Sequence, residues 1–138
     1  MTKEKSCGAL VMRRADDGKI YILMIRQNRG GFRSFPKGHV EPGESETMTA
    51  EREVLEETSV RVRVRTDFRR TVTYSPAPGI IKDVVYFLAF TENEETHPQD
   101  GEIAEVTWVP LESAEHILAH ENDRVVLRAA IRHISAEA

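Results

Sequence analysis

A helix with one face crowded by glutamates limits most strongly how this chain can fold. Ser45 is suited to cap the N-terminus of a helix over Glu46–Thr58. At about 100° per residue, Glu53, Glu56 and Glu57 stand three and four positions apart, so their carboxylates project from one narrow face. The pattern therefore predicts a helix that presents a cluster of like charges on one side and apolar contacts to a core on another.

The apolar contacts of this helix are expected from Met48 and Leu55, together with Ala50 and Val54. Its carboxylates repel one another, by roughly a few tenths of a kcal/mol for each exposed pair and by more where they are partly buried. A divalent cation among them would remove the repulsion, and hard oxygen ligands favour magnesium, or manganese, over zinc. A second interpretation is a solvated helix face, because glutamate is a good helix former. Spacing alone does not choose between the two.

The rest of the chain alternates between strand-like and helix-like patterns. The valines between Val60 and Arg65 alternate with arginines, which is typical of a half-buried strand, and the apolar run Asp83–Phe90 is typical of a central strand. Strands are predicted at Cys7–Arg14, Ile20–Arg26, Val60–Arg65, Phe68–Tyr74, Asp83–Phe90 and Val106–Val109, helices at Leu111–Ala119 and Asp123–Ile134, and loops at Gln27–Phe35, Ser75–Gly79 and Thr91–Gly101. This mixed order favours an α/β sandwich with helices on both sides of a mixed β-sheet.

Composition limits the size, surroundings and partners of the protein. The 138 residues are enough for one core, so a single domain over residues 1–138 is expected. With 23 acidic and 19 basic residues, the surface does not favour long nucleic acids. Cys7 is the single cysteine, and no apolar run is long enough to span a bilayer. We expect a cytoplasmic monomer or homodimer that acts on a small molecule and has neither membrane nor long nucleic acid as a partner.

The glutamate helix lies within a longer pattern. Residues 38–60 match G-x5-E-x7-R-E-V-x-E-E-x-S-V, which resembles the signature of the Nudix hydrolase family. The pattern departs from the family at Ser59, where glycine is usual. Glycine suits a left-handed residue at a helix end, and serine adopts that conformation at a cost of roughly 1 kcal/mol. The substitution removes no ligand, so it predicts no loss of activity.

The resemblance implies a Nudix α/β/α sandwich with a catalytic loop–helix–loop, and it implies roles for single residues. The residues matching metal-binding positions are Glu53, Glu56 and Glu57, with the backbone carbonyl of Lys37. Arg52 stands with the catalytic residues and is expected to hold loop and helix together with Glu44, while Gly38 allows a tight turn. Either Glu56 or Glu53 would be the general base.

The activity implied is magnesium-dependent hydrolysis of a nucleoside diphosphate-linked substrate. A diphosphate linkage is densely anionic, so hydrolysis needs a cation to neutralise phosphate oxygens and acidify an attacking water, and a carboxylate to take the proton. Residues 35–44 look closest to the subgroup that cleaves diadenosine tetraphosphate asymmetrically to ATP and AMP. That subgroup is therefore the expected one.

The likeness to this subgroup extends weakly over most of the chain and implies substrate contacts. Tyr74 would stack on adenine, Lys82 would meet a phosphate, and Glu102 would bind metal or act as base. Each of these residues also has a purely structural interpretation. Tyr74 would be an aromatic side chain that packs in a strand, Lys82 an ordinary lysine at a strand end, and Glu102 a solvated residue of a loop. Further substrate contacts are expected from Lys37, His39 and Arg26, the last in a phosphate clamp with Arg29 and Arg33.

Three other functions remain open. A nucleoside triphosphate pyrophosphatase would use the same helix and release a monophosphate and pyrophosphate. Hydrolysis of capped RNA belongs to the same chemistry. A non-catalytic nucleotide-binding module would predict the loss of carboxylates from residues 38–60, and none of them is missing.

Overall fold

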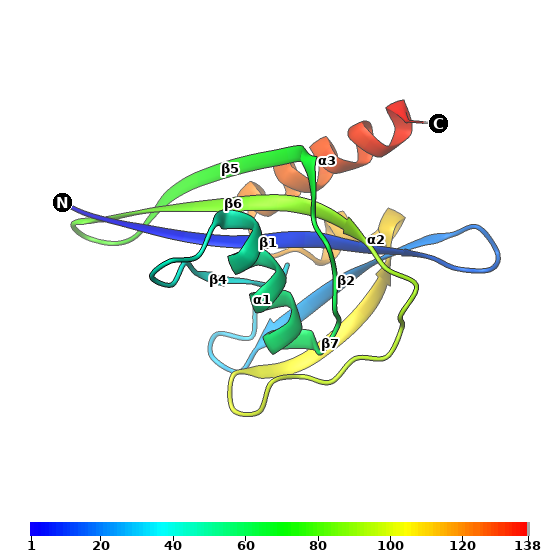
Figure 1. The fold of residues 1–138 in the computed structure, drawn as a ribbon, viewed down its shortest axis with the longest axis horizontal. Helices are drawn as coiled ribbons and strands as arrows, with labels where there is room; N and C mark the ends of the chain where they lie inside the picture. The colour runs from blue at the N-terminus through cyan, green and yellow to red at the C-terminus, as the bar shows by residue number, and fades with distance from the viewer. Residues whose placement is uncertain (138) are drawn as a thin grey trace.

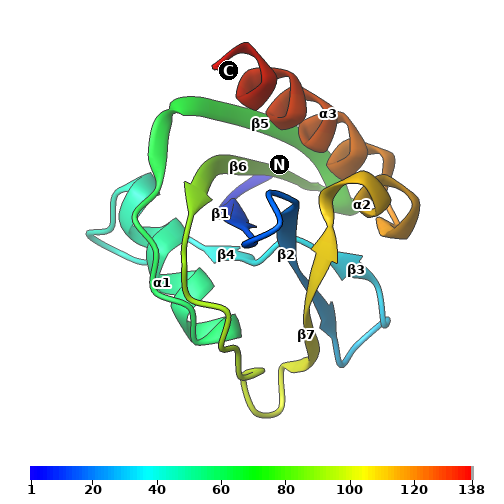
Figure 2. The ribbon, with the colours of Figure 1, turned by 90° about the vertical axis from the view of Figure 1, so that its right-hand side faces the viewer.

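The computed structural model describes residues 1–137, in which a mixed sheet lies between helices on its two sides (Figures 1 and 2). The strands are β1 (Thr2–Arg14), β2 (Ile20–Gln27), β3 (Arg33–Ser34), β4 (Lys37–His39), β5 (Arg65–Ala77), β6 (Ile80–Phe90) and β7 (Ile103–Pro110). The helices are α1 (Glu46–Thr58), α2 (Leu111–Ile117) and α3 (Glu121–Ala136). The predicted α/β/α sandwich is confirmed.

Two long parallel strands form the centre of the sheet. The strand order is β3-β2-β1-β6-β5, and β1 pairs with β6 in parallel from Thr2↔Ile80 to Met12↔Phe90. Strand β4 pairs with β1, and β7 pairs with β2. The apolar run Asp83–Phe90 is therefore a central strand, as predicted, because β6 has a neighbour on each edge.

Alternation along these central strands divides the core into two parts. On one face, residues such as Leu10 and Tyr86 pack with α2 and α3 in the larger core cluster. On the other face, residues such as Ala9 and Cys7 pack in clusters that include Val54 and Ala50 of α1. Because successive side chains of a strand point to opposite faces, one apolar strand supplies both cores. Figure 2 shows α1 on one side of the sheet and α2 and α3 on the other.

Helix α1 has the predicted bounds but not all of the predicted contacts. Ala50 and Val54 are fully buried, whereas Met48 is 53% exposed and Leu55 only half-buried. The expected core contact of Met48 is therefore wrong. The small side chains of Ala50 and Val54 allow the helix to approach the sheet closely. The longer side chains of Met48 and Leu55 then lie at the edge of this contact.

The predicted strand Val60–Arg65 is also wrong, because β5 begins only at Arg65. Val60 is buried and Val62 and Val64 are half-buried, so the alternation in burial is real. The backbone nevertheless has no ladder partner there, and the amide of Val64 donates to Glu51 Oε2 at 2.9 Å. Alternation of apolar and polar residues therefore indicates that one side of a segment is buried, but it does not show that the segment pairs with another strand.

Several loops and ends also differ from the sequence predictions. The predicted loop Ser75–Gly79 is mostly strand, because β5 continues to Ala77 and turns through Pro78 and Gly79 into β6. Gly79 has φ 80°, a left-handed conformation that glycine adopts without strain. The predicted loop Gln27–Phe35 contains β3. No helix within residues 1–137 has the length and apolar content needed to cross a membrane.

Candidate functional site

An arginine on α1 joins the preceding loop to the helix. Arg52 Nε donates to Glu44 Oε2 at 2.6 Å, and Arg52 Nη2 donates to Glu44 Oε1 and to the carbonyl of His39, both at 3.0 Å. Glu44 also accepts from the Glu41 amide and the Thr49 hydroxyl. The Arg52 guanidinium, followed by these donors, lowers the pKa of Glu44 to about 2. Glu44 and Arg52 thus form an ionised, bidentate tie between loop and helix.

The same guanidinium lies between two of the helix glutamates. Arg52 Nη1 donates to Glu53 Oε1 at 2.8 Å and to Glu56 Oε1 at 3.2 Å. The carboxylate of Glu53 packs against Gly38, where any Cβ would overlap it. Gly38 lies within strand β4 and does not have a positive φ, so the predicted tight turn is wrong, and the missing Cβ instead leaves room for the Glu53 carboxylate.

Glu57 is the buried member of the glutamate face. Its Oε1 accepts from the Lys37 amide at 3.1 Å, and its side chain is nearly inaccessible to solvent. Burial, and then the charge of Glu53, raise the pKa of Glu57 to about 8, and burial also raises the pKa of Glu53. The fold thus holds two neighbouring carboxyls largely out of water, of which Glu53 is paired with Arg52 and Glu57 accepts the Lys37 amide. That arrangement, made of hard oxygen donors, fits a divalent cation.

The glutamates of α1 do not converge on one tight point. Within residues 1–137, the group of three metal-type side chains whose ligand atoms all lie within 4.8 Å of one another is Asp67, His133 and Glu137. Arg65 already pairs with Asp67 and Glu137 in that group, so its charge is compensated. The α1 glutamates are instead spread along the helix, with Arg52 between two of them.

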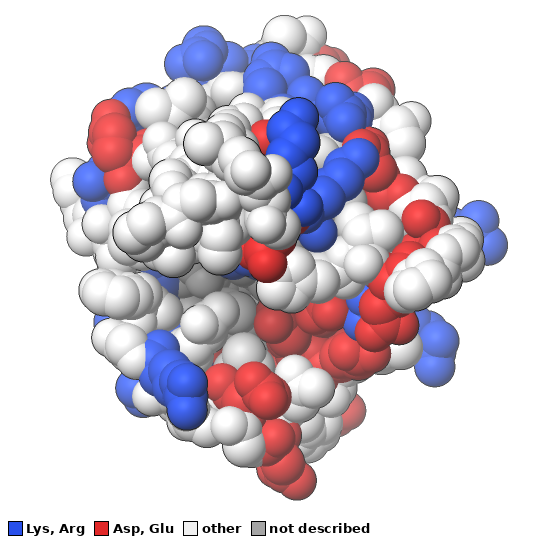
Figure 3. Space-filling view, turned by 90° about the vertical axis from the view of Figure 1, so that its left-hand side faces the viewer, with Lys and Arg blue, Asp and Glu red and all other residues white. Residues whose placement is uncertain are grey.

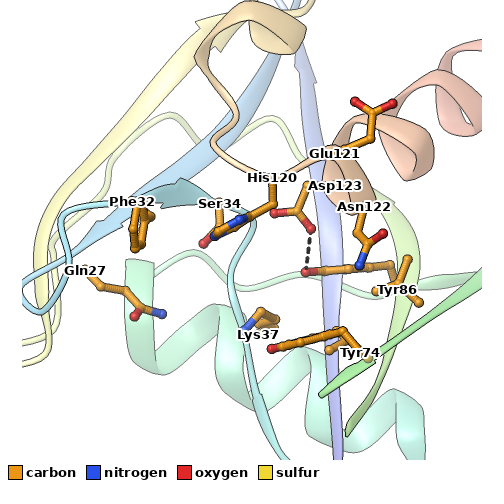
Figure 4. Close-up of a pocket in the computed structure, with 12 residues that line it drawn as sticks. Gln27, Phe32, Ser34, Lys37, Tyr74, Tyr86, His120, Glu121, Asn122 and Asp123 are labelled. Atoms are coloured by element: carbon orange, nitrogen blue, oxygen red, sulfur yellow. Dashed lines mark hydrogen bonds between the residues drawn. The ribbon is translucent and has the colours of Figure 1, made fainter. Parts of the chain in front are cut away.

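A pocket of about 460 Å³ lies on the face of the sheet that α3 covers, and its lining residues come from outside α1. Its walls combine aromatic and polar side chains and are formed by Gln27, Phe32, Ser34, Lys37, Val72, Tyr74, Val84, Tyr86, His120, Glu121, Asn122 and Asp123. Figure 4 shows Tyr74 and Lys37 directed toward the same part of the pocket, while Glu121 points away from it. Lys37 links the two regions, because its amide binds Glu57 and its side chain lines the pocket. Acidic side chains gather beside a hollow on the face in Figure 3.

Sequence reasoning missed the floor and far wall of this pocket. Tyr86 is fully buried in the core, as its strand pattern predicts, and its hydroxyl donates to Asp123 Oδ1 at 3.4 Å across the pocket. Asp123 is buried at the start of α3, and burial raises its pKa. Asn122 and Phe32 are further pocket-lining residues that the sequence did not indicate. The acidic start of α3 was the available signal, but it is equally expected from the helix dipole.

Tyr74 and Lys82, the predicted substrate contacts, lie side by side on the β5–β6 hairpin. They are register partners, and Tyr74 is 37% exposed at the pocket wall. Lys82 is half-buried, and burial followed by the nearby charge of Lys37 lowers its pKa. Lys82 is not among the residues that line the pocket, so its contact with a phosphate stays a prediction.

The other predicted contacts are less directly related to the pocket. Arg26 is half-buried on β2, beside Arg33, which pairs with Glu105 at 3.1 Å. Arg29 is exposed. His39 has an exposed side chain and contributes its carbonyl to Arg52. Arg26 and His39 are not among the pocket-lining residues, and their substrate contacts stay predictions.

Glu102 is exposed in the connection before β7. The amide of Gln99 donates to the Glu57 carbonyl at 3.3 Å, and the amide of Glu102 donates to the Gln99 carbonyl at 3.3 Å. The backbone of Glu102 is thus two hydrogen bonds away from that of Glu57. Its role as ligand or base stays a prediction, as does the Lys37 carbonyl as a ligand.

Comparison with known proteins identifies similar chains. The NUDIX domain family profile matches residues 4–130. An 8-oxo-(d)GTP phosphatase of Mycolicibacterium smegmatis is 30% identical over 93% of this chain and 41% of its own length. The asymmetrical bis(5'-nucleosyl)-tetraphosphatase of Rattus norvegicus is 30% identical over 90% of both chains. A binary complex of the C. elegans Ap4A hydrolase superposes with a TM-score of 0.87 at 29% identity, covering 96% of this chain and 98% of that one. The chain spans only 54% and 41% of two mycobacterial relatives.

Proposed function

Because the chain belongs to the NUDIX domain family, we propose that it hydrolyses a nucleotide substrate at a diphosphate bond. The observation that carries the proposal is the junction at Lys37, which joins a buried carboxylate on α1 to an aromatic pocket of nucleoside size. One side of this junction is suited to a cation and a phosphate, and the other to a base.

The cation proposed is magnesium, with manganese as a substitute. Glu53, Glu56 and Glu57 would hold it, together with the Lys37 carbonyl and Glu102. When bound, the cation supplies neutralisation of phosphate oxygens and acidification of an attacking water. Among the protein's own groups, Glu56 is the best candidate to accept the proton, because its side chain is 43% exposed whereas that of Glu53 is 14% exposed. Arg52 orients both carboxylates through its Nη1.

The substrate proposed is diadenosine tetraphosphate, cleaved asymmetrically to ATP and AMP. Tyr74 offers a ring on which adenine stacks, and Lys37 and Lys82 attract the polyphosphate. The pocket has room for one nucleoside, so the second would lie outside it. Support comes from the rat and C. elegans proteins, whose similarity to this chain extends over nearly their whole length.

A second candidate is nucleoside triphosphate pyrophosphatase activity. It is favoured by the polar groups of Asn122 and Asp123 in the pocket, which can read a base edge, and by the relative named as an 8-oxo-(d)GTP phosphatase. Both candidates share the glutamates of α1. They differ in the bond that is broken and in the products, which are ATP and AMP for the first candidate and a nucleoside monophosphate and pyrophosphate for the second.

The test is a substrate panel in oxygen-18 water with magnesium, containing diadenosine polyphosphates, nucleoside triphosphates, capped RNA and sugar nucleotides. We expect diadenosine tetraphosphate to be cleaved fastest, to ATP and AMP, with oxygen-18 in one product only. Faster release of pyrophosphate from a triphosphate would favour the second candidate. Absence of hydrolysis, with nucleotide binding retained, would favour a binding module.

Replacing Tyr74 by alanine should raise KM for adenine dinucleotides roughly tenfold, within the range of one lost stacking contact. The value of kcat should change by less than about twofold, because Tyr74 lies on the pocket wall and not on α1. Steady-state kinetics measure both constants. Tyr74→Phe, which keeps the ring, is the matched control and should retain KM. An unchanged KM in Tyr74→Ala would indicate a packing role.

Replacing Glu102 by glutamine should slow turnover by roughly 10²-fold, the lower range for loss of a general base or a comparable group. Its side chain is exposed, so the fold should be unaffected. Glu95→Gln, an exposed carboxylate of the same connection, is the matched control. Wild-type turnover in Glu102→Gln would assign Glu102 to a solvated loop.

A further inference from the structure

The C-terminal end of α1 has an unusual residue at its cap. Ser59 has φ 66° and is the non-glycine residue with positive φ within residues 1–137. Its amide donates to the Leu55 carbonyl at 2.9 Å, so it ends the helix in the left-handed conformation that glycine adopts without strain. Serine at this position therefore needs a compensating interaction.

The segment His97–Glu102 supplies donors to this helix end. The last carbonyls of a helix lack partners within the helix, and the last turn of α1 contains no basic residue. The His97 amide donates to the Thr58 carbonyl at 3.0 Å, and the Gln99 amide donates to the Glu57 carbonyl at 3.3 Å. Pro98, between them, has no amide hydrogen to satisfy.

The Ser59 side chain adds a third bond that glycine cannot make. Its hydroxyl donates to the His97 carbonyl at 3.3 Å. His97 is thus held on both of its backbone groups, by Thr58 through the amide and by Ser59 through the carbonyl. Serine is more strained than glycine in this left-handed conformation, but its hydroxyl bonds the helix end to the segment His97–Glu102.

This tie continues to Glu102. The Gln99 carbonyl accepts the Glu102 amide at 3.3 Å and the Ile103 amide at 3.0 Å, which forms a tight turn. The Glu102 carbonyl in turn accepts the amide of Asn28, just after β2. Glu102 is therefore fixed between the end of α1 on one side and the end of β2 on the other.

We propose that Ser59 is a positioning residue, whose hydroxyl holds His97–Glu102 on the end of α1 and thereby fixes Glu102 relative to the carboxylates of that helix. The inference rests on the proposed function, in which Glu102 acts with those carboxylates. Ser59 itself touches neither substrate nor cation.

The test compares Ser59→Gly, Ser59→Ala and Ser59→Asn in the full chain, with Ser135→Ala on the exposed end of α3 as control. Glycine relieves the backbone and removes the hydroxyl, alanine removes the hydroxyl alone, and asparagine tolerates the left-handed conformation while keeping a side-chain donor. Hydrogen exchange at the His97, Gln99 and Glu102 amides reports the tie without substrate. Thermal unfolding and steady-state kinetics complete the comparison.

In Ser59→Gly we expect the three amides to exchange roughly two- to tenfold faster, as for the loss of one neutral hydrogen bond. The Tm should not fall, kcat should fall severalfold, and KM should stay close to wild type. Ser59→Asn should restore both exchange and kcat. A merely structural helix end would instead make activity follow Tm, with glycine as the best variant.

Two outcomes would overturn the inference. Unchanged exchange in Ser59→Gly would show that the hydroxyl does not hold the segment, and faster exchange with full kcat would show that the tie does not position Glu102. A wild-type protein inactive on the whole substrate panel would contradict the proposed function separately. In that case faster exchange at Glu102 in Ser59→Gly would still support the tie, because exchange needs no substrate.

Discussion

Replacing Glu56 by glutamine is expected to reduce magnesium-dependent turnover by roughly 10²–10⁴-fold, the range for loss of a positioned proton acceptor. The fold should persist. Glu56 is exposed on α1 and contacts Arg52, which keeps Glu44 and Glu53 as partners, so no buried group loses its only contact. Turnover on the best substrate of the panel, together with Tm and the far-ultraviolet circular dichroism spectrum, measures both parts.

Glu112→Gln, an exposed carboxylate on α2, is the control for Glu56→Gln and should be active. Glu53→Gln gives the comparison that assigns the base. A larger loss of kcat in Glu56→Gln would assign proton acceptance to Glu56, and the reverse order would assign it to Glu53. Activity within twofold of wild type in both variants would rule out the glutamates of α1 as the catalytic site.

Features set by neighbouring residues could be predicted from the sequence. Helix α1 has its predicted bounds because Ser45 caps one end, with its side chain accepting from the Met48 amide at 3.2 Å, and Ser59 ends the other. The central strand could be predicted because an uninterrupted apolar run requires cover on both faces. Both signals act within a few residues of the chain.

Pairing and pocket formation depend on distant residues and could not be predicted in the same way. The segment from Val60 to Val64 has the burial of a strand, but it pairs with no strand within residues 1–137, and sequence alternation carries no information about such pairing. Asp123 and Phe32 line the same pocket as Tyr86 only because the fold brings α3 and the β2–β3 loop to that pocket. Phe32 has no local sequence signal, and the acidic first turn that contains Asp123 is equally expected from the helix dipole.

The roles implied by the Nudix resemblance gain a physical constraint from the structure. Arg52 does more than tie the loop to the helix, because its Nη1 already bridges Glu53 and Glu56. A cation at those two carboxylates must compete with the guanidinium. Within residues 1–137, Glu57 has no arginine contact of this kind and its carboxylate accepts the Lys37 amide, so under the proposed function it is the carboxylate that a cation would stabilise most.

Replacing Glu57 by glutamine should therefore abolish stabilisation by magnesium. For the wild type, magnesium at a hundred times its Kd should stabilise the fold by about 2.7 kcal/mol, a Tm increase of roughly 5–10 °C for a chain of this length. Burial and Glu53 disfavour the ionised carboxyl of Glu57, and glutamine keeps the oxygen that accepts the Lys37 amide. Metal-free Glu57→Gln should thus be at least as stable as metal-free wild type.

Thermal unfolding of the two proteins in EDTA and in a magnesium series measures this difference, and Glu137→Gln decides where the cation binds. Glu137 belongs to the group with Asp67 and His133, in which Arg65 already supplies positive charge. Glu137→Gln should keep the full magnesium-dependent rise in Tm, since that group needs no cation. If the rise disappeared in Glu137→Gln and survived in Glu57→Gln, the cation would bind between β5 and α3, and α1 would lose its assignment as the metal helix.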